Sequence, residues 1–259
     1  MPEPDPDPLR GFRLDGRVAV ITGASGGFGA RFARVLTAVG ARVVLAARRR
    51  ERIEALAAEL PGALAVACDV ARAEDNERLI ATARARCGGV DVLINNAGIT
   101  EGPKPARETT LAEFQQVLAV DLVAAFQLSV LAANSMRERG RGSIVNVASI
   151  HGLVAGAPNA QAAYVAAKGG LVNLTRELAC QWAREGVRVN AIAPAYFATE
   201  ITAGMFADER SMRWLRRNTP LGRPGRIEEL DGALLYLASD ASSYVTGTTL
   251  CVDGGWTAR

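Results

Sequence analysis

Short apolar runs alternate with longer stretches of helical periodicity from residue 17 to the end of the chain. Most of these runs are continuously apolar, which is typical of strands buried on both faces of a parallel sheet. The strands predicted in this way are Val18–Thr22, Val43–Ala46, Ala63–Ala67, Val90–Ile94, Ser143–Val147, Val187–Ala191 and Thr249–Val252.

Helical patterns fill the intervals between these strands, at Gly29–Val39, Arg50–Leu60, Ala73–Arg86, Thr110–Arg137, Ala162–Arg184 and Ile227–Ala238. Glycines that follow several of them are expected to end helices; these are Gly40, Gly88, Gly140 and Gly186. Repeated β-α units with right-handed crossovers predict an α/β protein with a Rossmann-type, doubly wound, seven-stranded parallel sheet and helices on both faces. Neither a linker nor a repeat divides the sequence, so we expect a single domain.

The composition argues against several classes of function. Apolar residues make up 49% of the 259 residues, and the net charge of +3 is carried by arginines interspersed with acids, so no nucleic-acid partner is expected. The apolar runs fall short of the ~18 residues of a membrane span, so no membrane partner is expected either. Because His151 is the only histidine, a histidine-based metal site and a serine–histidine triad are disfavoured. We therefore predict no metal.

Residues 1–11 are expected to be a disordered tail, because prolines alternate with acidic residues and the apolar segment of a secretory signal is missing. The domain would then span residues 12–259. Cys68, Cys87, Cys180 and Cys251 are widely spaced and form no CxxC pair. They are interpreted as buried structural thiols, which indicates a reducing, cytoplasmic location.

A glycine-rich segment, residues 22–29, leads directly from the first strand into a helix. A tight turn, close backbone approach and a helix N-terminus bind phosphate groups in this context. The spacing is Gly-x3-Gly-x-Gly instead of GxGxxG, and turns are rich in glycine anyway, so the position after the first strand carries the prediction. Dinucleotide contacts are expected at Gly23, Ser25, Gly27, Phe28 and Gly29.

The end of the second strand distinguishes the two nicotinamide dinucleotides. An NAD site places an acidic residue there to hold the ribose 2′-hydroxyl. Here Ala46 and Ala47 precede the arginines at positions 48–50, and these would attract a 2′-phosphate. A solvated helix start explains some of these arginines equally well. We expect NADP(H) to be favoured over NAD(H), with Arg48 as the principal contact.

Tyr164 and Lys168 form an unusual pair. Lysine occurs only at positions 104 and 168, and every other basic residue is arginine. Residues four apart share one face of a helix, and a compact ammonium suits a phenol partner better than a guanidinium does. Chance and a solvated helix face are the alternatives to a catalytic pair.

Together these motifs resemble the short-chain dehydrogenase/reductase family in its single-domain branch. The resemblance spans residues 12–256. Besides the glycine segment and the Tyr164-x3-Lys168 pair, it rests on Asp69, Asn95–Gly98, Ser149, Asn190–Pro194, Leu237–Asp240, Gly247 and Val252–Gly255.

The resemblance implies an oxidoreductase that interconverts a carbonyl and a secondary alcohol by hydride transfer. Tyr164 would be the general acid/base, Lys168 would hold the nicotinamide ribose and favour the ionised form of Tyr164, and Ser149 would bind the substrate oxygen. The remaining implied cofactor contacts are Asp69, Val70, Asn96, Ala97, Gly98, Pro194, Phe197 and Thr199. Without the other motifs, residues 95–98 would be interpreted as an ordinary β-α turn.

Two positions depart from the family pattern. Asp121 stands in a Val-Asp-Leu context where the family usually has the asparagine that anchors a proton-relay water. If the backbone carbonyl of residue 121 holds the relay water, an aspartate preserves the relay. If the side chain matters, the negative charge of Asp121 either weakens the effect of Lys168 on Tyr164 or pairs with a neighbouring group. Ala195 follows Pro194 where glycine is usual. Because Ser149, Tyr164 and Lys168 remain, activity is expected, and Asp121 is kept as a candidate catalytic residue.

The resemblance implies a small carbonyl or alcohol compound as the substrate. His151 and Tyr196 are candidate substrate contacts, although a structural or surface histidine is an equal alternative, and residues 196–218 are expected to form a substrate lid. The amino-acid sequence around residues 196–200 and 218–223 is similar to that of gluconate-type dehydrogenases and of 3-oxoacyl-carrier-protein reductases. The family also suggests a homotetramer, or a dimer.

Two other functions compete with this prediction. A catalytically silent, dinucleotide-sensing Rossmann protein would have little reason to keep both Tyr164 and Lys168. A Rossmann-type methyltransferase gives no reason for their spacing. Replacing Tyr164 with phenylalanine distinguishes these cases.

Overall fold

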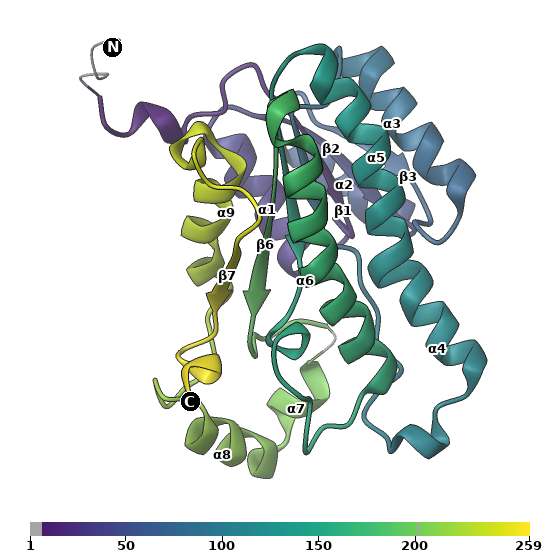
Figure 1. Ribbon diagram of the computed structural model, residues 1–259, viewed down its shortest axis with the longest axis vertical. Helices are drawn as coiled ribbons and strands as arrows, with labels where there is room; N and C mark the ends of the chain where they lie inside the picture. Colours follow the sequence, from purple (N-terminus) through teal and green to yellow (C-terminus); the bar gives the residue numbers. More distant parts are fainter. Residues whose placement is uncertain (1–6, 201) are drawn as a thin grey trace.

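The predicted strands pair in one parallel sheet (Figure 1). In the computed structural model, which describes residues 7–200 and 202–259, this sheet has seven strands in the order β3-β2-β1-β4-β5-β6-β7. The strands are β1 Val18–Thr22, β2 Arg42–Ala47, β3 Leu64–Ala67, β4 Val92–Asn95, β5 Gly142–Val147, β6 Val187–Pro194 and β7 Thr249–Val252. The Rossmann-type prediction is therefore confirmed, and β6 continues past its predicted end at Ala191.

Helices cover both faces of the sheet, and α7 and α8 lie beyond the carboxyl end of β6 (Figure 1). The helices are α1 Gly27–Ala38, α2 Arg50–Glu59, α3 Ala73–Cys87, α4 Leu111–Leu118, α5 Ala124–Glu138, α6 Ala162–Trp182, α7 Ala203–Ala207, α8 Glu209–Asn218 and α9 Asp231–Ala238. Side chains of α1, α2 and α9 share a buried core with Ala19 and Ile21 of β1. Those of α3, α5 and α6 share another with Val18 and Val20. Successive residues of a strand point to opposite faces, so the continuous apolar run of β1 reflects burial on both sides.

The helical stretch predicted as Thr110–Arg137 is not a uniform α-helix. Thr110 caps α4 in a capping box with Glu113, and a π-helical segment, η3 (Ala119–Val123), separates α4 from α5. Helical π segments are rare and occur often at functional sites, because the wider turn redirects a side chain. Asp121 lies in this segment and is buried.

The continuous stretch Leu111–Glu138 has the length and hydropathy of a membrane-spanning helix. It packs against other elements of the fold, since α4 contacts α6, and α5 contacts α3, β4 and β5. Part of its apolar surface is therefore buried in the helix layer on one face of the sheet.

The N-terminal tail was predicted to span residues 1–11. Residues 1–6 of the predicted tail lie outside the described residues, and Arg10–Phe12 forms a 3-10 turn.

The expectation that all four cysteines are buried is wrong for Cys180, which is exposed on α6. Helices bury one face only, and position 180 falls on the outer face. Cys68 is buried, and this burial raises the pKa of its thiol to about 12.

Candidate active site

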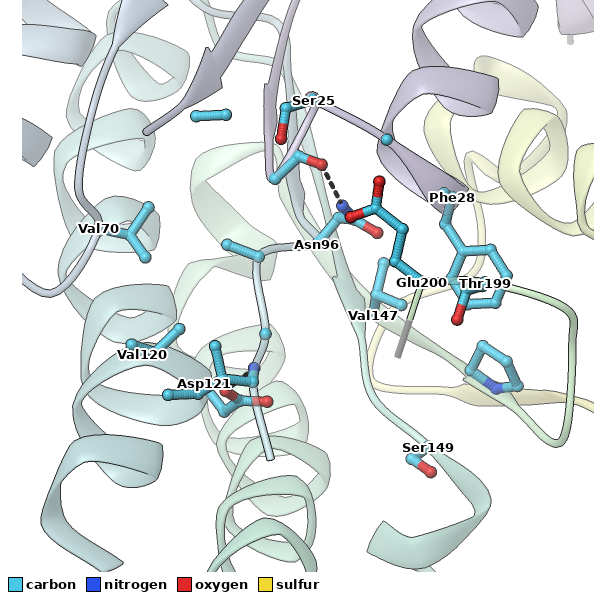
Figure 2. A pocket seen from close by; sticks show the side chains of 18 of the residues that line it. Ser25, Phe28, Val70, Asn96, Val120, Asp121, Val147, Ser149, Thr199 and Glu200 are labelled. Carbon is cyan, nitrogen blue, oxygen red and sulfur yellow. Dashed lines mark hydrogen bonds between the residues drawn. The ribbon is translucent and has the colours of Figure 1, made fainter. Parts of the chain in front are cut away.

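A cavity of about 430 Å³ lies at the carboxyl ends of the strands, where the chain order of the sheet reverses between β1 and β4 (Figure 2). Ligands of doubly wound sheets bind at this point because neighbouring connections diverge there. Most predicted site residues line it: Gly23, Ser25, Gly27, Phe28, Arg48, Asp69, Val70, Asn96, Ala97, Gly98, Asp121, Ser149, Tyr164, Lys168, Pro194, Phe197 and Thr199.

The glycine turn after β1 is held by the segment that follows β4. Asn96 donates its side-chain amide to the carbonyl of Thr22 at 2.8 Å, and the Thr22 hydroxyl accepts the backbone N–H groups of Asn96 and Ala97 at 3.0 Å each. A Cβ at Gly23 would lie 2.8 Å from the Asn96 amide nitrogen, and the φ of Gly23 is +65°. Only glycine fits this position without strain. Figure 2 shows Asn96 directed toward this turn.

The N-terminus of α1 opens into the cavity. Its N-cap residue is Gly26, which supplies no side-chain cap, so the first N–H groups of this helix need another partner. Together with the partial positive charge of a helix N-terminus, they form a suitable site for a phosphate group. Gly29 does not line the cavity; it lies beneath the turn, where an added Cβ would collide with the carbonyl of Gly23.

Two arginines border the cavity beside the glycine turn. Arg48 lines it and is exposed. Arg49 donates two hydrogen bonds to the Ser25 hydroxyl, at 3.0 and 2.9 Å, and pairs with Glu200 at 2.7 Å. Arg52 pairs with the other oxygen of Glu200 at 2.5 Å, and these hydrogen bonds lower the pKa of the Glu200 carboxyl. The arginines thus bind the carboxylate of Glu200. The same guanidinium groups are placed to donate hydrogen bonds to a ligand phosphate at this part of the cavity.

The predicted catalytic residues meet at another part of the cavity wall. Ser149 follows β5 and caps the 3-10 turn η4 (Ile150–Gly152), where its hydroxyl accepts the N–H of His151 at 3.1 Å. Tyr164 and Lys168 project from the first turns of α6. The Lys168 ammonium lies 5.5 Å from the centre of the Tyr164 ring and donates to the carbonyl of Val147 at 3.0 Å.

Asp121 contacts this pair directly. Its carboxylate lies 3.1 Å from the Lys168 ammonium, and both side chains are almost completely buried. Its other oxygen accepts the N–H of Ile99 at 2.8 Å. The sequence left open whether the backbone or the side chain of Asp121 matters at this position. The structure places the side-chain carboxylate in contact with Lys168.

The donor set fits a nicotinamide dinucleotide. Uncapped helix N–H groups and arginines stand at one part of the cavity, and a hydroxyl, a phenol and an ammonium stand at another. Among residues 7–200 and 202–259, no cluster of three or more histidine, cysteine or acidic residues is placed to hold a metal ion.

Comparison with known proteins assigns the chain to a family. A family model described as enoyl-(acyl carrier protein) reductase matches residues 23–257. A solved short-chain type dehydrogenase/reductase from Mycobacterium marinum superposes with a TM-score of 0.93 at 34% identity, covering 98% of this chain and 100% of that one. The chain belongs to the short-chain dehydrogenase/reductase family.

Two further relatives bear on the chemistry of this short-chain dehydrogenase/reductase. Galactitol 2-dehydrogenase (L-tagatose-forming) of Cereibacter sphaeroides is 43% identical over 249 residues, which is 95% of this chain and 97% of that one. A gluconate 5-dehydrogenase from Burkholderia cenocepacia, solved in complex with NADP and tartrate, is 37% identical with a TM-score of 0.93, covering 98% of this chain and 100% of that one. The chain is accordingly an oxidoreductase that interconverts alcohol and carbonyl groups.

The two predicted substrate residues of this short-chain dehydrogenase/reductase do not line the cavity. His151 is buried behind Ser149, with its ring 6.3 Å from that of Tyr164. Its Nε2 lies 3.4 Å from the Tyr196 hydroxyl, and Tyr196 packs edge-on against Trp214 and Trp256. Burial lowers the pKa of His151 and raises that of Tyr196. Both are therefore neutral at pH 7.

Several cavity-lining residues were not predicted as site residues from the sequence: Gly26, Ala47, Arg49, Cys68, Ile99, Val120, Val147, Ala148, Ala195, Glu200 and Thr202. The arginine cluster already pointed to the neighbourhood of Arg49. Glu200 follows the predicted contact Thr199, but nothing in the sequence indicated that it pairs with arginines some 150 residues earlier.

Proposed function

We propose that this short-chain dehydrogenase/reductase oxidises a secondary alcohol, or reduces the corresponding ketone, with Tyr164, Lys168 and Ser149 as its catalytic residues. The observation that carries the proposal is their meeting on one cavity whose other wall holds the glycine turn, Ser25 and Arg48. A dinucleotide that lies along this cavity extends from the arginines to the tyrosine.

In the direction of ketone reduction, the Tyr164 phenol donates its proton to the carbonyl oxygen, and the Ser149 hydroxyl stabilises the charge that develops there. In the direction of oxidation, the Tyr164 phenolate accepts the proton of the alcohol. The nicotinamide, when bound, supplies or accepts the hydride. The Lys168 ammonium, held by the Val147 carbonyl, favours the phenolate electrostatically and has a donor left for a ribose hydroxyl.

NADP(H) is the proposed cofactor, in preference to NAD(H). A 2′-phosphate at the end of β2 would meet the exposed guanidinium of Arg48 and the linked pair of Ser25 and Arg49. No acidic residue occupies the end of this strand to hold an unphosphorylated ribose. The gluconate 5-dehydrogenase from Burkholderia cenocepacia, which is similar over almost the whole chain, was solved with NADP.

The proposed substrate class is a small polyol or sugar acid. The support comes from the names of two similar proteins, a galactitol 2-dehydrogenase and a gluconate 5-dehydrogenase. Residues 196–218 are proposed as the lid over the substrate. They contain α7 and α8, which Figure 1 shows beyond the carboxyl end of β6.

A cytoplasmic homotetramer, or a dimer, is the proposed biological form. The four cysteines are all free thiols, in keeping with a reducing compartment. Leu111, Val123 and Phe126 are apolar and exposed along α4, η3 and α5, in keeping with a buried position in an oligomer. Light scattering measures the number of subunits.

Replacement of Tyr164 by phenylalanine tests the function. NADPH-dependent reduction of candidate keto-sugars and keto-acids should fall by about 10²–10⁴-fold, while NADPH binding, followed by its fluorescence, is retained. Full turnover in the variant would refute the assignment of Tyr164. Cofactor binding without turnover in the unaltered protein, against polyols, sugar acids and 3-oxoacyl thioesters alike, would favour the silent dinucleotide sensor.

A further inference from the structure

The ion pair between Asp121 and Lys168 is buried in the wall of the cavity. The two side chains are 0% and 5% exposed, and their charged atoms lie 3.1 Å apart. A Cβ on Gly98 would approach the Asp121 carboxylate to 2.9 Å and the Lys168 ammonium to 3.5 Å. The backbone of the segment after β4 thus packs closely against one side of the pair.

The contacts of the two groups show which charges are compensated. Lys168 donates a hydrogen bond to the carbonyl of Val147, and its ammonium forms an ion pair with Asp121 at 3.1 Å. The Asp121 oxygen that faces the ammonium has no hydrogen-bond donor among the described residues, so the ammonium is its counter-charge. The other ionisable groups around the pair are Tyr164, on the same helix as Lys168, and Glu101 from the segment after β4.

The protonation of the pair is set by burial and by mutual attraction. Burial raises the pKa of Asp121 above its usual value, and the Lys168 ammonium offsets only part of this effect. Burial would lower the pKa of Lys168, but the Asp121 carboxylate and Tyr164 together outweigh it and hold that pKa above its usual value. The lysine consequently remains an ammonium. Because the Asp121 carboxylate lies beside it, Lys168 exerts a smaller electrostatic effect on Tyr164 than an unpaired ammonium would.

We propose that Asp121 is a positioning residue that acts through Lys168 and sets the pH at which Tyr164 exchanges its proton. A lone ammonium stabilises a nearby phenolate, and a carboxylate in contact with that ammonium cancels part of the stabilisation. Tyr164 therefore works at a higher pH here than it would beside an uncompensated lysine. This inference rests on the proposed role of Tyr164.

Asp121→Asn removes the charge and keeps the shape and the acceptor for Ile99. In alcohol oxidation with saturating substrates, the midpoint of the rising limb of kcat against pH should move down by about one pH unit. Glu113→Gln is the matched control: it removes one carboxylate from α4, where Glu113 pairs with Lys104, and should leave the midpoint unchanged. A purely structural role of Asp121 would lower stability without moving the midpoint.

A second measurement does not depend on turnover. Tyrosinate absorbs ultraviolet light at longer wavelength than the neutral phenol, and subtraction of the Tyr164→Phe spectrum isolates one of the four tyrosines. The titration midpoint isolated in this way should also be lower in the Asp121→Asn protein. Asp121→Ser removes the same charge with a smaller side chain and should shift the midpoint in the same direction.

The outcomes separate this inference from the proposed function. If Tyr164→Phe keeps its turnover, the proposed function is refuted. If Tyr164→Phe is inactive but the midpoint in both Asp121 variants is unchanged or higher, the role of Asp121 is refuted while the function stands. Failure of both Asp121 variants to fold, even with cofactor present, also counts against the inference, because the pair would then serve stability.

Discussion

The Glu101 carboxylate accepts a hydrogen bond from the backbone N–H of Tyr164 at 3.2 Å and a second one from Ala163 at 2.7 Å. The N-cap residue of α6, Gln161, makes no side-chain cap of its own and instead accepts a hydrogen bond from Thr100. The helix that carries the catalytic tyrosine is therefore capped by a segment about 60 residues earlier in the chain.

Glu101→Ala should reduce both stability and catalysis. Loss of the cap should lower the free energy of unfolding by about 1 kcal/mol, and the freed first turn should lower kcat with little change in the KM for the cofactor. Thr110→Ala is the matched control, because it removes the cap of α4 at similar cost to stability but should leave kcat intact. Denaturant unfolding and steady-state kinetics measure both effects. An equal loss of kcat in the two variants would show that the cap acts only through global stability.

Arg48 and Arg49 should determine the choice of cofactor. A charge-assisted hydrogen bond to a phosphate contributes about 1.5–3 kcal/mol, so replacing either arginine by alanine should raise the KM for NADPH by about 10- to 100-fold and leave that for NADH nearly unchanged. Arg50→Ala serves as control, since Arg50 pairs with Glu54 on the surface of α2. Initial rates with both cofactors give the ratio. A clear preference of the unaltered enzyme for NADH would refute the role of both residues.

His151 should make stability depend on pH in a defined window. Its pKa is lowered in the folded protein by burial, so the unfolded chain binds the proton more tightly. The stabilising contribution is therefore complete above the unfolded pKa of about 6.5 and is lost as pH falls below it, with a slope of at most about 1.4 kcal/mol per pH unit.

His151→Gln removes the only histidine and should flatten the stability profile between pH 7 and 5. Urea unfolding at several pH values supplies the curves. An unchanged slope would mean that His151 is freely protonated in the folded protein and that the local environment is more hydrated than its burial indicates.

Local patterns were sufficient for the elements of the fold. Apolar runs, most of them continuous, located every strand of the described sheet, because a strand covered on both faces tolerates few polar residues along its length. Glycine marked helix ends correctly: Gly88 and Gly186 follow their helices with φ values of +85° and +79°. The π segment around Asp121 was not predicted, since it differs from an α-helix only in hydrogen-bond register.

Side-chain partners from distant segments were less accessible to sequence analysis. Asp121 was recognised as a departure, but its contact with Lys168 depends on how α6 packs against η3. His151 and Tyr196 were selected by position and are found hydrogen-bonded to each other behind the catalytic serine. Arg49, the neighbour of the predicted contact Arg48, binds Ser25 because the end of β2 lies beside the glycine turn.

The sequence by itself predicted the α/β sheet, the glycine turn and the proposed catalytic residues, because each is encoded by periodicity or spacing within one short segment. The tertiary structure alone decided how these residues are held: Asp121 against Lys168, Glu101 beneath Tyr164, and Glu200 between Arg49 and Arg52. These contacts join segments brought together only when the sheet and its helices pack. That packing pairs the charge of Lys168 with Asp121 and caps the helix that carries Tyr164. It thereby determines the surroundings of the proposed catalytic tyrosine.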